Sequence, residues 1–574
     1  MGIGGLNTFI EDNYRWLSVP IRSIKRLVID GNNLSCKLCH RHEWVMGGDY
    51  PGIYKTVTEF VDKLKKLGIC LDVILDGIDR EEKCTNVRNR REKRLKQILQ
   101  CQAKRSVDCK ASVLPLFDRL VFLDALQDAH VPFHIADGEA DAEIVAIANF
   151  YGCPVLTDDS DFYIFNVKGG YIPLRYFFKA LGGKEVVRVY NITSMAEQFK
   201  FQDPDLRLLI PAILGNDYIK RLKYPDLDNP GKIFQSLSQC LSAKQYLDSV
   251  PDSDIHENYS KAAKFYNVKL ERNPAELSEV TSLDVPKWIL ERYREGCFAP
   301  GMVRVIMTHR CILPVVVDDM RSECAQHIGL RIRRFTYGIL NCKQPVQETI
   351  RDNGTPPHLI DNKVHCLKLK PPVSLEMICG LEVTERIQIL CSVLSDCYKL
   401  IDCIPSEWKL VIASCIYWYK KAKPTPKHHL LRALVQCLIV CRDGHVQHMA
   451  TSQAESLASK NYPSFLETLH AYAQWQCTYG NAVALNQLLM EPFEYVSPAF
   501  LYSGRLAMHY AAICSQSQTC ELTQDQNKLY HHLMQPFTEK LVTTAGACKQ
   551  PQVTTQIRTF SHPNRFALLQ NESK

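Results

Sequence analysis

The chain has 574 residues, with 69 Lys and Arg against 62 Asp and Glu, so its formal net charge is +7. So small an excess excludes a histone-like protein whose whole surface neutralises phosphates, although it leaves a local basic patch open. Hydrophobic residues at 46% and charged residues at 23% exclude a largely disordered chain, and the length suffices for two or three domains.

Neither a secretory signal nor a membrane span is found in the sequence. The N-terminal segment MGIGGLNTFI lacks the basic stretch and apolar run of a signal peptide. No apolar run approaches the roughly 18 residues that a membrane span needs. We therefore expect a soluble intracellular protein that makes no membrane contact.

The first part of the chain, to about residue 220, alternates short apolar runs with helical patterns. This alternation predicts an α/β fold with a mostly parallel sheet flanked by helices. Strands are predicted at 26–30, 70–76, 131–137 and 153–159, and amphipathic helices at 56–67 and 140–150.

Beyond Asp217 the pattern turns mainly helical. Helices are predicted at 232–247, 285–295, 381–400 and 430–441. Pro-rich interruptions at 344–357 and 423–427 predict loops or a seam between two subdomains. The polar stretch 549–574 is expected to be ragged.

The spacing of Cys36 and Cys39, followed by His40 and His42, is that of metal ligands. A structural zinc site usually needs a second such pair, and the sequence offers no convincing one. Core or surface cysteines are therefore the favoured interpretation, and a zinc site stays open as the alternative.

Acidic residues follow all four predicted strands directly. They are Asp30, Asp76, the group Asp137, Glu139 and Asp141, and the group Asp158, Asp159 and Asp161. Any one of them alone is more often a turn or helix-capping residue. Four strands that end in this way favour a shared site, because the carboxyl ends of parallel strands meet at one edge, where ligands bind.

Clustered carboxylates repel one another unless a cation compensates, and hard oxygen ligands suit magnesium or manganese. Two such ions roughly 4 Å apart can clamp the attacking and leaving oxygens of a phosphoryl displacement. The predicted chemistry is therefore metal-assisted hydrolysis of a phosphodiester.

A strongly basic segment, 80–110, begins just after Asp76. It holds eleven Lys and Arg against four Asp and Glu, a net charge of +7 that equals the excess of the whole chain. A solvated helical face is the alternative to a phosphate-binding one. The position favours phosphate binding, since Lys83, Arg90 and Arg94 lie at roughly helical spacing beside the predicted metal edge.

Seven pieces in order then resemble the flap endonuclease/XPG family of structure-specific nucleases, which has a PIN-like fold. They are MGIGGL (1–6), LVIDGNN (27–33), VILDG (73–77), the basic helix, ADGEADAE (136–143), TDDSDFYIF (157–165) and LGNDY (214–218). Within the family, the chain is similar to a divergent branch with a long helical C-terminal region. The resemblance implies an XPG N-terminal-like part (1–110), an XPG internal-like part that completes the metal site (111–225), and a mainly helical region (226–574).

The resemblance also implies roles for particular residues. The metal-site carboxylates fall on Asp30, Asp76, Glu139, Asp141, Asp159, Asp161 and Asp217, around two Mg²⁺ or Mn²⁺ ions. Lys83 and Arg90 take the place of the basic pair over the scissile phosphate. Contacts to nucleic acid are expected from Gly2, Arg80, Arg91, Arg94, Lys104 and Arg105.

Three departures from the family bear on specificity. The stretch 217–233 lacks the Gly-x-Gly pattern with which relatives grip duplex phosphates, and Cys36 replaces an aromatic residue that stacks a base. A peptide that binds the sliding clamp is not evident at the tail. We therefore expect cleavage of single strands or overhangs rather than 5′ flaps.

The first hypothesis is a two-metal DNA endonuclease in the nucleus, with a repair-protein partner bound through the helical C-terminal region. The alternative is a catalytically weak, nuclease-like adaptor in DNA repair, which a lost metal ligand would have favoured. An aspartyl phosphatase would need an Asp-x-Asp pair after the first strand, and Asp30-Gly-Asn-Asn33 does not supply it. Basic clusters at 331–334 and 420–427 are interpreted as solvated faces, with nucleic-acid contact or nuclear targeting as the alternative.

Overall fold

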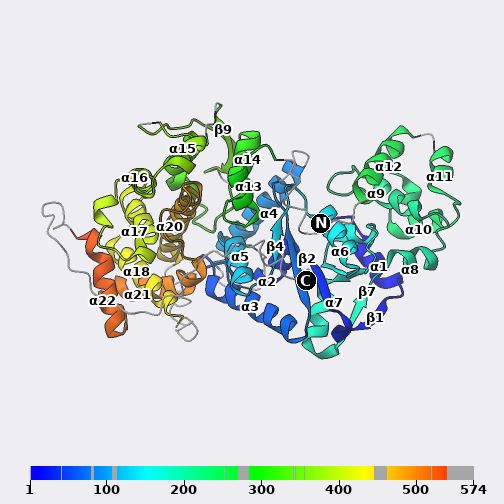
Figure 1. Cartoon of the computed structure of the whole chain (residues 1–574), viewed down its shortest axis with the longest axis horizontal. Helices are drawn as coiled ribbons and strands as arrows, with labels where there is room; N and C mark the ends of the chain where they lie inside the picture. Colours follow the sequence, from blue (N-terminus) through cyan, green and yellow to red (C-terminus); the bar gives the residue numbers. More distant parts are fainter. Residues whose placement is uncertain are drawn as a thin grey trace.

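The structure is a computed structural model of the chain. It describes residues 2–40, 42–78, 83–105, 113–250, 252–268, 283–340, 342, 344–354, 356–370, 372–444, 462–518 and 520–538. The molecule is elongated, with a sheet near its middle, helices α10 (Pro230–Leu237), α11 (Ala243–Ser249) and α12 (Ser253–Tyr266) at one end, and the C-terminal helices at the other (Figure 1).

The central sheet has five parallel strands in the order β4–β3–β2–β5–β6. Their bounds are β2 (Arg26–Asp30), β3 (Cys70–Leu75), β4 (Phe133–Ile135), β5 (Val155–Thr157) and β6 (Tyr171–Pro173). Helices cover both faces, so the inner strands are nearly continuous apolar runs. The four predicted strands and the parallel arrangement are confirmed. The sequence analysis missed β6, a strand of three residues that ends in a proline.

The helices around this sheet are α2 (Gly31–Cys39), α3 (Tyr50–Lys66), α4 (Cys84–Ala103), α5 (Asp118–Asp128), α6 (Asp141–Tyr151) and α7 (Leu174–Lys179). Helix α3 begins six residues before the predicted start at Thr56. Asp49 caps it by accepting a hydrogen bond from the backbone of Gly52, and Pro51 suits the first helical turn.

A second hydrophobic core lies on one face of the sheet, where it takes in Val28 of β2, Ile74 of β3, Val155 of β5 and Tyr171 of β6. It includes residues of α1 (Leu6–Asn13), α8 (Ile192–Gln198), α9 (Leu209–Leu214), α10, α11 and α12. The short strands β1 (Leu17–Pro20) and β7 (Val186–Val189) pair antiparallel nearby. The helix predicted over 232–247 is in fact two helices, because Ser242 caps a new helix through the backbone of Gln245.

The C-terminal region is mainly helical, as predicted. Its helices are α13 (Lys287–Arg294), α14 (Pro300–Thr308), α15 (Leu330–Ile339), α16 (Val383–Val393), α17 (Ser406–Lys421), α18 (His428–Arg442), α20 (Tyr462–Leu488), α21 (Gly504–Ser515) and α22 (Gln524–Met534). The described residues include no helix long and apolar enough to cross a membrane.

A three-stranded sheet in this region was not predicted. Its strands are β8 (Arg310–Ile312), β9 (Val346–Arg351) and β10 (Leu359–Val364), in the order β10–β9–β8. The prediction that 344–357 is a loop or a seam is therefore wrong. Strand β9 carries Glu348 and Arg351 as buried residues, and such ion-paired positions do not show in a hydrophobic pattern.

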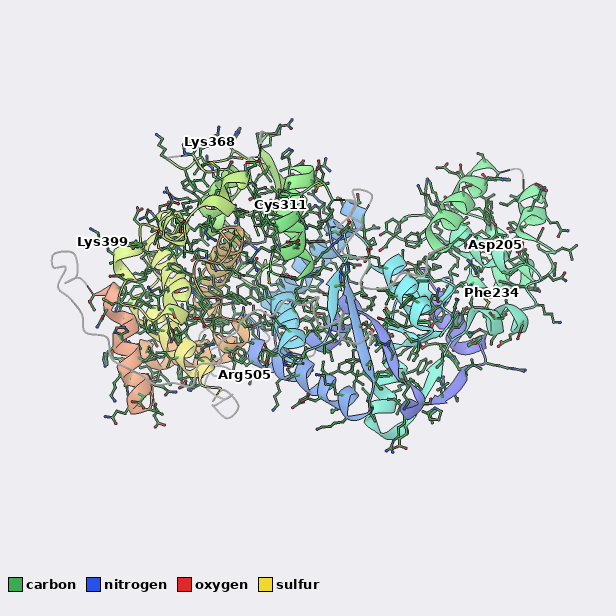
Figure 2. The ribbon with its side chains drawn as sticks, viewed as in Figure 1. Asp205, Phe234, Cys311, Lys368, Lys399 and Arg505 are labelled. Carbon is green, nitrogen blue, oxygen red and sulfur yellow. The ribbon has the colours of Figure 1, made fainter. Side chains whose placement is uncertain are left out.

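Helices α20 and α21 pack directly on the N-terminal part. Tyr50 of α3 donates a 2.7 Å hydrogen bond to Gln476 of α20, and Arg505 of α21 pairs with Glu43 at 2.7 Å (Figure 2). One hydrophobic cluster runs from Ile21 to residues of α22. The boundaries expected near residues 110 and 225 stay predictions.

Candidate active site

Asp30 stands where β2 passes into α2. It caps α2 by accepting hydrogen bonds from the backbone and side-chain nitrogens of Asn33, at 3.0 and 2.8 Å. The hydroxyl of Thr157, at the end of the neighbouring strand β5, donates to it at 2.8 Å. The parallel pairing of β2 with β5 therefore fixes the orientation of this carboxylate.

Asp76 follows β3 at the same edge. Its carboxylate accepts from the Asn32 side chain at 2.6 Å and from the backbone of Ala140 at 3.0 Å. The second bond ties Asp76 to the loop that leads into α6. This loop carries Glu139, and Asp141 begins the helix.

Asp161 lies on the short helix η3 (Ser160–Tyr163) that follows β5, and Asp159 directly precedes this helix. Asp159 caps this helix through the backbone of Asp161, at 3.1 Å. Gly2 packs against this turn with φ of +80°, and a Cβ on Gly2 would lie 2.4 Å from Asp159 Oδ1. The glycine therefore allows the N-terminal segment to approach the acidic edge closely.

The structure brings the seven predicted ligands into electrostatic contact. Burial and Asp76 raise the pKa of Asp30 to about 7, and burial and Asp159 raise that of Asp161 to about 8. The pKa of Asp141 is raised well above its usual value by burial and then by Asp159 and Asp76. Burial also raises the pKa of Asp159, and the charge of Asp217 adds to this shift. The pKa of Glu139 is raised in the same way by burial and by the charge of Asp76.

Two basic side chains of the α4 segment face these carboxylates. Lys83 forms an ion pair with Glu139, and Arg90 forms one with Asp217 at 2.5 Å. Burial alone would lower the pKa of Lys83, but Glu139, Asp76 and Asp141 together outweigh burial and the pKa is raised. Both residues predicted to act on the scissile phosphate thus lie at the acidic edge, together with Asn86, which donates to the backbone of Asp217 at 3.2 Å.

As the side chains stand, no group of three or more His, Cys, Asp or Glu among the described residues is arranged to hold a metal ion. The donor chemistry nevertheless fits a hard divalent cation. The seven candidates are all carboxylates. Asp30 and Asp161 are buried and the other five are half-buried, and their mutual repulsion disfavours the charged forms unless positive charge is added. Lys83 and Arg90 supply part of that charge.

The predicted nucleic-acid contacts on α4 divide into different environments. Arg91 donates to the backbone carbonyls of Ile312, at 2.7 Å, and of Leu313. Lys104 and Arg105 are exposed at the C-terminal end of the helix. Arg94 is half-buried. Its charge acts to lower the pKa of the Cys36 thiol, but desolvation has the larger effect and the pKa is raised. Arg80 lies outside the described residues.

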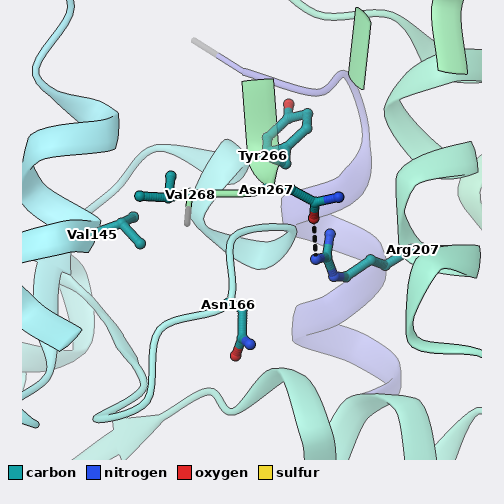
Figure 3. A pocket seen from close by; sticks show the side chains of 6 residues that line it. All are labelled: Val145, Asn166, Arg207, Tyr266, Asn267 and Val268. Carbon is teal, nitrogen blue, oxygen red and sulfur yellow. Dashed lines mark hydrogen bonds between the residues drawn. The ribbon is translucent and has the colours of Figure 1, made fainter. Parts of the chain in front are cut away.

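Tyr266, at the end of α12, is a site residue that the sequence analysis missed. Its buried hydroxyl donates to Asp161 at 2.6 Å and accepts from Asn216 at 2.8 Å. It also lines a cavity of about 110 Å³ with Val145, Asn166, Arg207, Asn267 and Val268 (Figure 3). The residue lies beyond the matched motifs, so no pattern in the sequence could have identified it.

Two features noted in the sequence have structural explanations. His42 bonds to Asp49 through Nδ1 at 3.2 Å and to Thr56 through Nε2 at 2.8 Å, which accounts for it without a metal. Beyond α9, Asn216 accepts from the backbones of Tyr218 and Ile219, and residues 215–224 form no helix. The stretch that lacks the Gly-x-Gly pattern thus begins as an irregular loop in this structure.

Comparison with known proteins shows what the chain as a whole is similar to. A family model described as "XPG domain containing" matches residues 120–355, and one described as "Asteroid N-terminal domain" matches residues 444–548. The mouse protein named "Single-strand DNA endonuclease ASTE1" is 26% identical over 93% of this chain and 90% of its own length. The human protein of the same name is 27% identical over 93% and 89%. These matches confirm the predicted family. The chain is an XPG/flap endonuclease relative close to asteroid.

Fruit-fly "Protein asteroid" is more similar over a shorter stretch, at 37% identity over 30% of this chain and 20% of that protein. Among solved structures, the catalytic core of Rad2 with DNA substrate matches with a TM-score of 0.30 and 16% identity, over 51% of this chain and 85% of that one. Human GEN1 with Holliday junction DNA matches with a TM-score of 0.31 and 13% identity, over 64% and 89%. The divergent branch expected from the sequence is thus that of asteroid.

Proposed function

We propose that this asteroid relative is a divalent-metal-dependent endonuclease that hydrolyses phosphodiesters in DNA with single-stranded parts. The observation that carries the proposal is the gathering of seven carboxylates at one sheet edge, with Lys83 and Arg90 paired to two of them. Relatives that align with 93% of the chain are named single-strand DNA endonucleases, which supports the same substrate class.

The metal would be Mg²⁺ or Mn²⁺, as two ions, held by Asp30, Asp76, Glu139, Asp141, Asp159, Asp161 and Asp217. When bound, it would supply hydroxide at neutral pH and neutralise charge on the phosphate. Lys83 and Arg90 would exchange their carboxylate partners for phosphate oxygens of the substrate, since guanidinium and ammonium donors bind either anion. They would thereby orient the phosphate that is cut.

The preference for single strands or overhangs over 5′ flaps rests on two features. Residues 215–224 form a loop where relatives carry a motif that grips duplex phosphates. Cys36 offers no ring on which a base of a flap could stack. Single-stranded DNA would then be held mainly by the basic face of α4, with affinity that falls steeply as salt rises.

The decisive test is a substrate panel with metal-ligand variants. Purified protein with Mg²⁺ should cut labelled single strands and overhangs, and Asp30→Asn or Asp159→Asn should lower the rate at least about 100-fold. Asp158→Asn is the matched control, because Asp158 neighbours Asp159 but pairs with Lys37 at 3.6 Å. Full activity of Asp30→Asn and Asp159→Asn would refute the proposed metal-dependent activity. Preferred cleavage of 5′ flaps would refute the proposed preference for single strands or overhangs.

Nuclear localisation, a repair-protein partner on the C-terminal helices, and the division into parts 1–110, 111–225 and 226–574 belong to the same proposal. Nuclear localisation is supported by the proposed action on DNA. Limited proteolysis would test the division, and imaging of the tagged protein would test the compartment.

A further inference from the structure

The basic helix α4 is not a free-standing helix, because the sheet β8–β9–β10 lies against it. Arg88 pairs with Asp361 of β10 at 3.1 Å and also donates to the backbone carbonyl of Leu359. Arg91 donates to the carbonyl of Ile312 in β8 at 2.7 Å. Cys311, labelled in Figure 2, marks the position of β8 close to α4.

A further contact holds the C-terminal end of the helix. Gln102 donates to the carbonyl of Asp318 at 2.6 Å and accepts from the backbone of Met320 at 3.2 Å. From Arg88 to Gln102 these contacts span about 21 Å of helix. With the carbonyl of Leu313, which Arg91 also binds, five backbone groups of the C-terminal region contact α4 along most of its length, and backbone groups leave no signal in the sequence.

The sheet is itself anchored, so it can serve as a rigid support. The hydroxyl of Thr349 in β9 donates at 2.6 Å to Asp361, its partner across the strands, and orients the carboxylate towards Arg88. Behind it, Glu348 accepts from Arg333 of α15 through both oxygens, at 2.7 and 3.0 Å. A carboxylate fixed in this way positions the guanidinium that it binds.

The side chains of α4 therefore fall on three faces. One face, with Lys83 and Arg90, is turned to the acidic edge, and a second, with Arg88 and Arg91, is turned to the sheet. The third face is exposed along the helix and consists of Thr85, Asn89, Lys93, Lys96, Gln100 and Lys104. Their spacing of three or four residues makes them one continuous stripe.

We propose that the sheet β8–β9–β10 is a brace that holds α4 over the acidic edge before DNA arrives, with Arg88 and Asp361 as positioning residues. A DNA strand then meets the exposed stripe of α4, and its phosphates bind Lys93 and Lys96 rather than Arg88 and Arg91. This inference rests on the proposed function, since it names the surface that presents the strand to the same site.

The brace makes a prediction that a direct phosphate contact does not. If Arg88 binds DNA directly, removal of Asp361 frees the guanidinium of Arg88, and DNA binding stays unchanged or becomes stronger. If Arg88 positions the helix, Arg88→Gln and Asp361→Asn break the same ion pair, so their effects go in the same direction and the double variant shows less than their sum. The pair can then be restored with the charges exchanged.

The experiment uses the full chain with Arg88→Gln, Asp361→Asn, the double variant, and the exchange Arg88→Asp with Asp361→Arg in a Glu92→Gln background. Glu92→Gln alone is the control, because Glu92 is the other partner of Arg88, at 3.5 Å, and lies on α4 itself. Amide hydrogen exchange over residues 84–103 is measured without DNA, and single-turnover cleavage of a labelled single strand is measured beside DNA affinity.

We expect each single variant and the double variant to speed exchange in α4 about three- to tenfold and to lower the cleavage rate by a similar factor, with a smaller change in affinity. The charge exchange restores both. The double variant Lys93→Gln with Lys96→Gln should instead bind DNA more weakly, and its DNA affinity should depend less on salt. Amide hydrogen exchange in α4 should not change in this variant. The brace is overturned if amide hydrogen exchange in α4 is unchanged in both Arg88→Gln and Asp361→Asn. It is also overturned if Arg88→Gln binds DNA more weakly and Asp361→Asn does not. If the wild-type chain cuts no DNA, the proposed function fails, and the exchange measurements still decide the brace.

Discussion

The hydroxyl of Tyr266 is expected to matter for catalysis although it lies outside every recognisable motif. It donates to Asp161, which is 4% exposed, so Tyr266→Phe leaves a buried carboxylate oxygen without this donor. A hydrogen bond to a charged group contributes about 1.5–3 kcal/mol. At about 1.4 kcal/mol per factor of ten, this corresponds to a loss of roughly 10- to 100-fold in kcat/KM.

The assay is single-turnover cleavage of a labelled single strand over a range of Mg²⁺ concentrations. A residue that orients a metal ligand should raise the Mg²⁺ concentration needed for half-maximal rate, whereas a purely structural residue should not. Tyr259→Phe is the matched control on the same helix α12, where Tyr259 is only partly buried. A Tyr266→Phe protein that is folded and has wild-type rate and metal dependence would refute the reasoning.

Three further predictions concern other parts of the molecule. Burial raises the pKa of Asp118 to about 6, so its stabilising contribution is present below about pH 4 and is lost as the pH rises through 6. Asp118→Asn should therefore raise the melting temperature at pH 7.5 and change it little at pH 4, which calorimetry would check. Gly2→Ala places a Cβ 2.4 Å from Asp159 Oδ1 and should lower kcat/KM about tenfold or more, whereas Gly4→Ala, with no atom within 4 Å, should not. Glu348→Gln leaves a buried guanidinium without its anion and should lower the free energy of unfolding by about 3–5 kcal/mol in denaturant titrations, and a loss under about 1 kcal/mol would contradict this.

The central sheet could be predicted because its strands carry a simple signal. Strands β2 and β3 are buried on both faces, so each is a mostly apolar run, broken in β3 by Asp72, and an aspartate ends the run or follows it directly. The same signal predicted that Asp30 and Asp76 share one edge. The sheet β8–β9–β10 could not be found in this way, because β9 buries Glu348 and Arg351 in ion pairs and resembles a polar loop in sequence.

The environment of the basic helix was equally hidden from the sequence. The segment 80–110 showed where the charge lies but not which cations already have protein partners. Arg91 binds backbone carbonyls more than 200 positions away, and such acceptors are present in every residue. The role of Tyr266 depends in the same way on a long-range contact, 105 residues from Asp161.

The packing of α20 and α21 on α3 has a consequence for the synthesis of the chain. Gly48 accepts a hydrogen bond from the backbone of Gly504, and Asp49 pairs with Ser503 across an isolated bridge. Until the segment around residues 498–504 has left the ribosome, the side of α3 that it covers lacks this partner, although α5 already packs on the helix. The catalytic half should therefore complete its packing only after this distant segment has been made, and until then chaperones that bind exposed apolar helices should protect it.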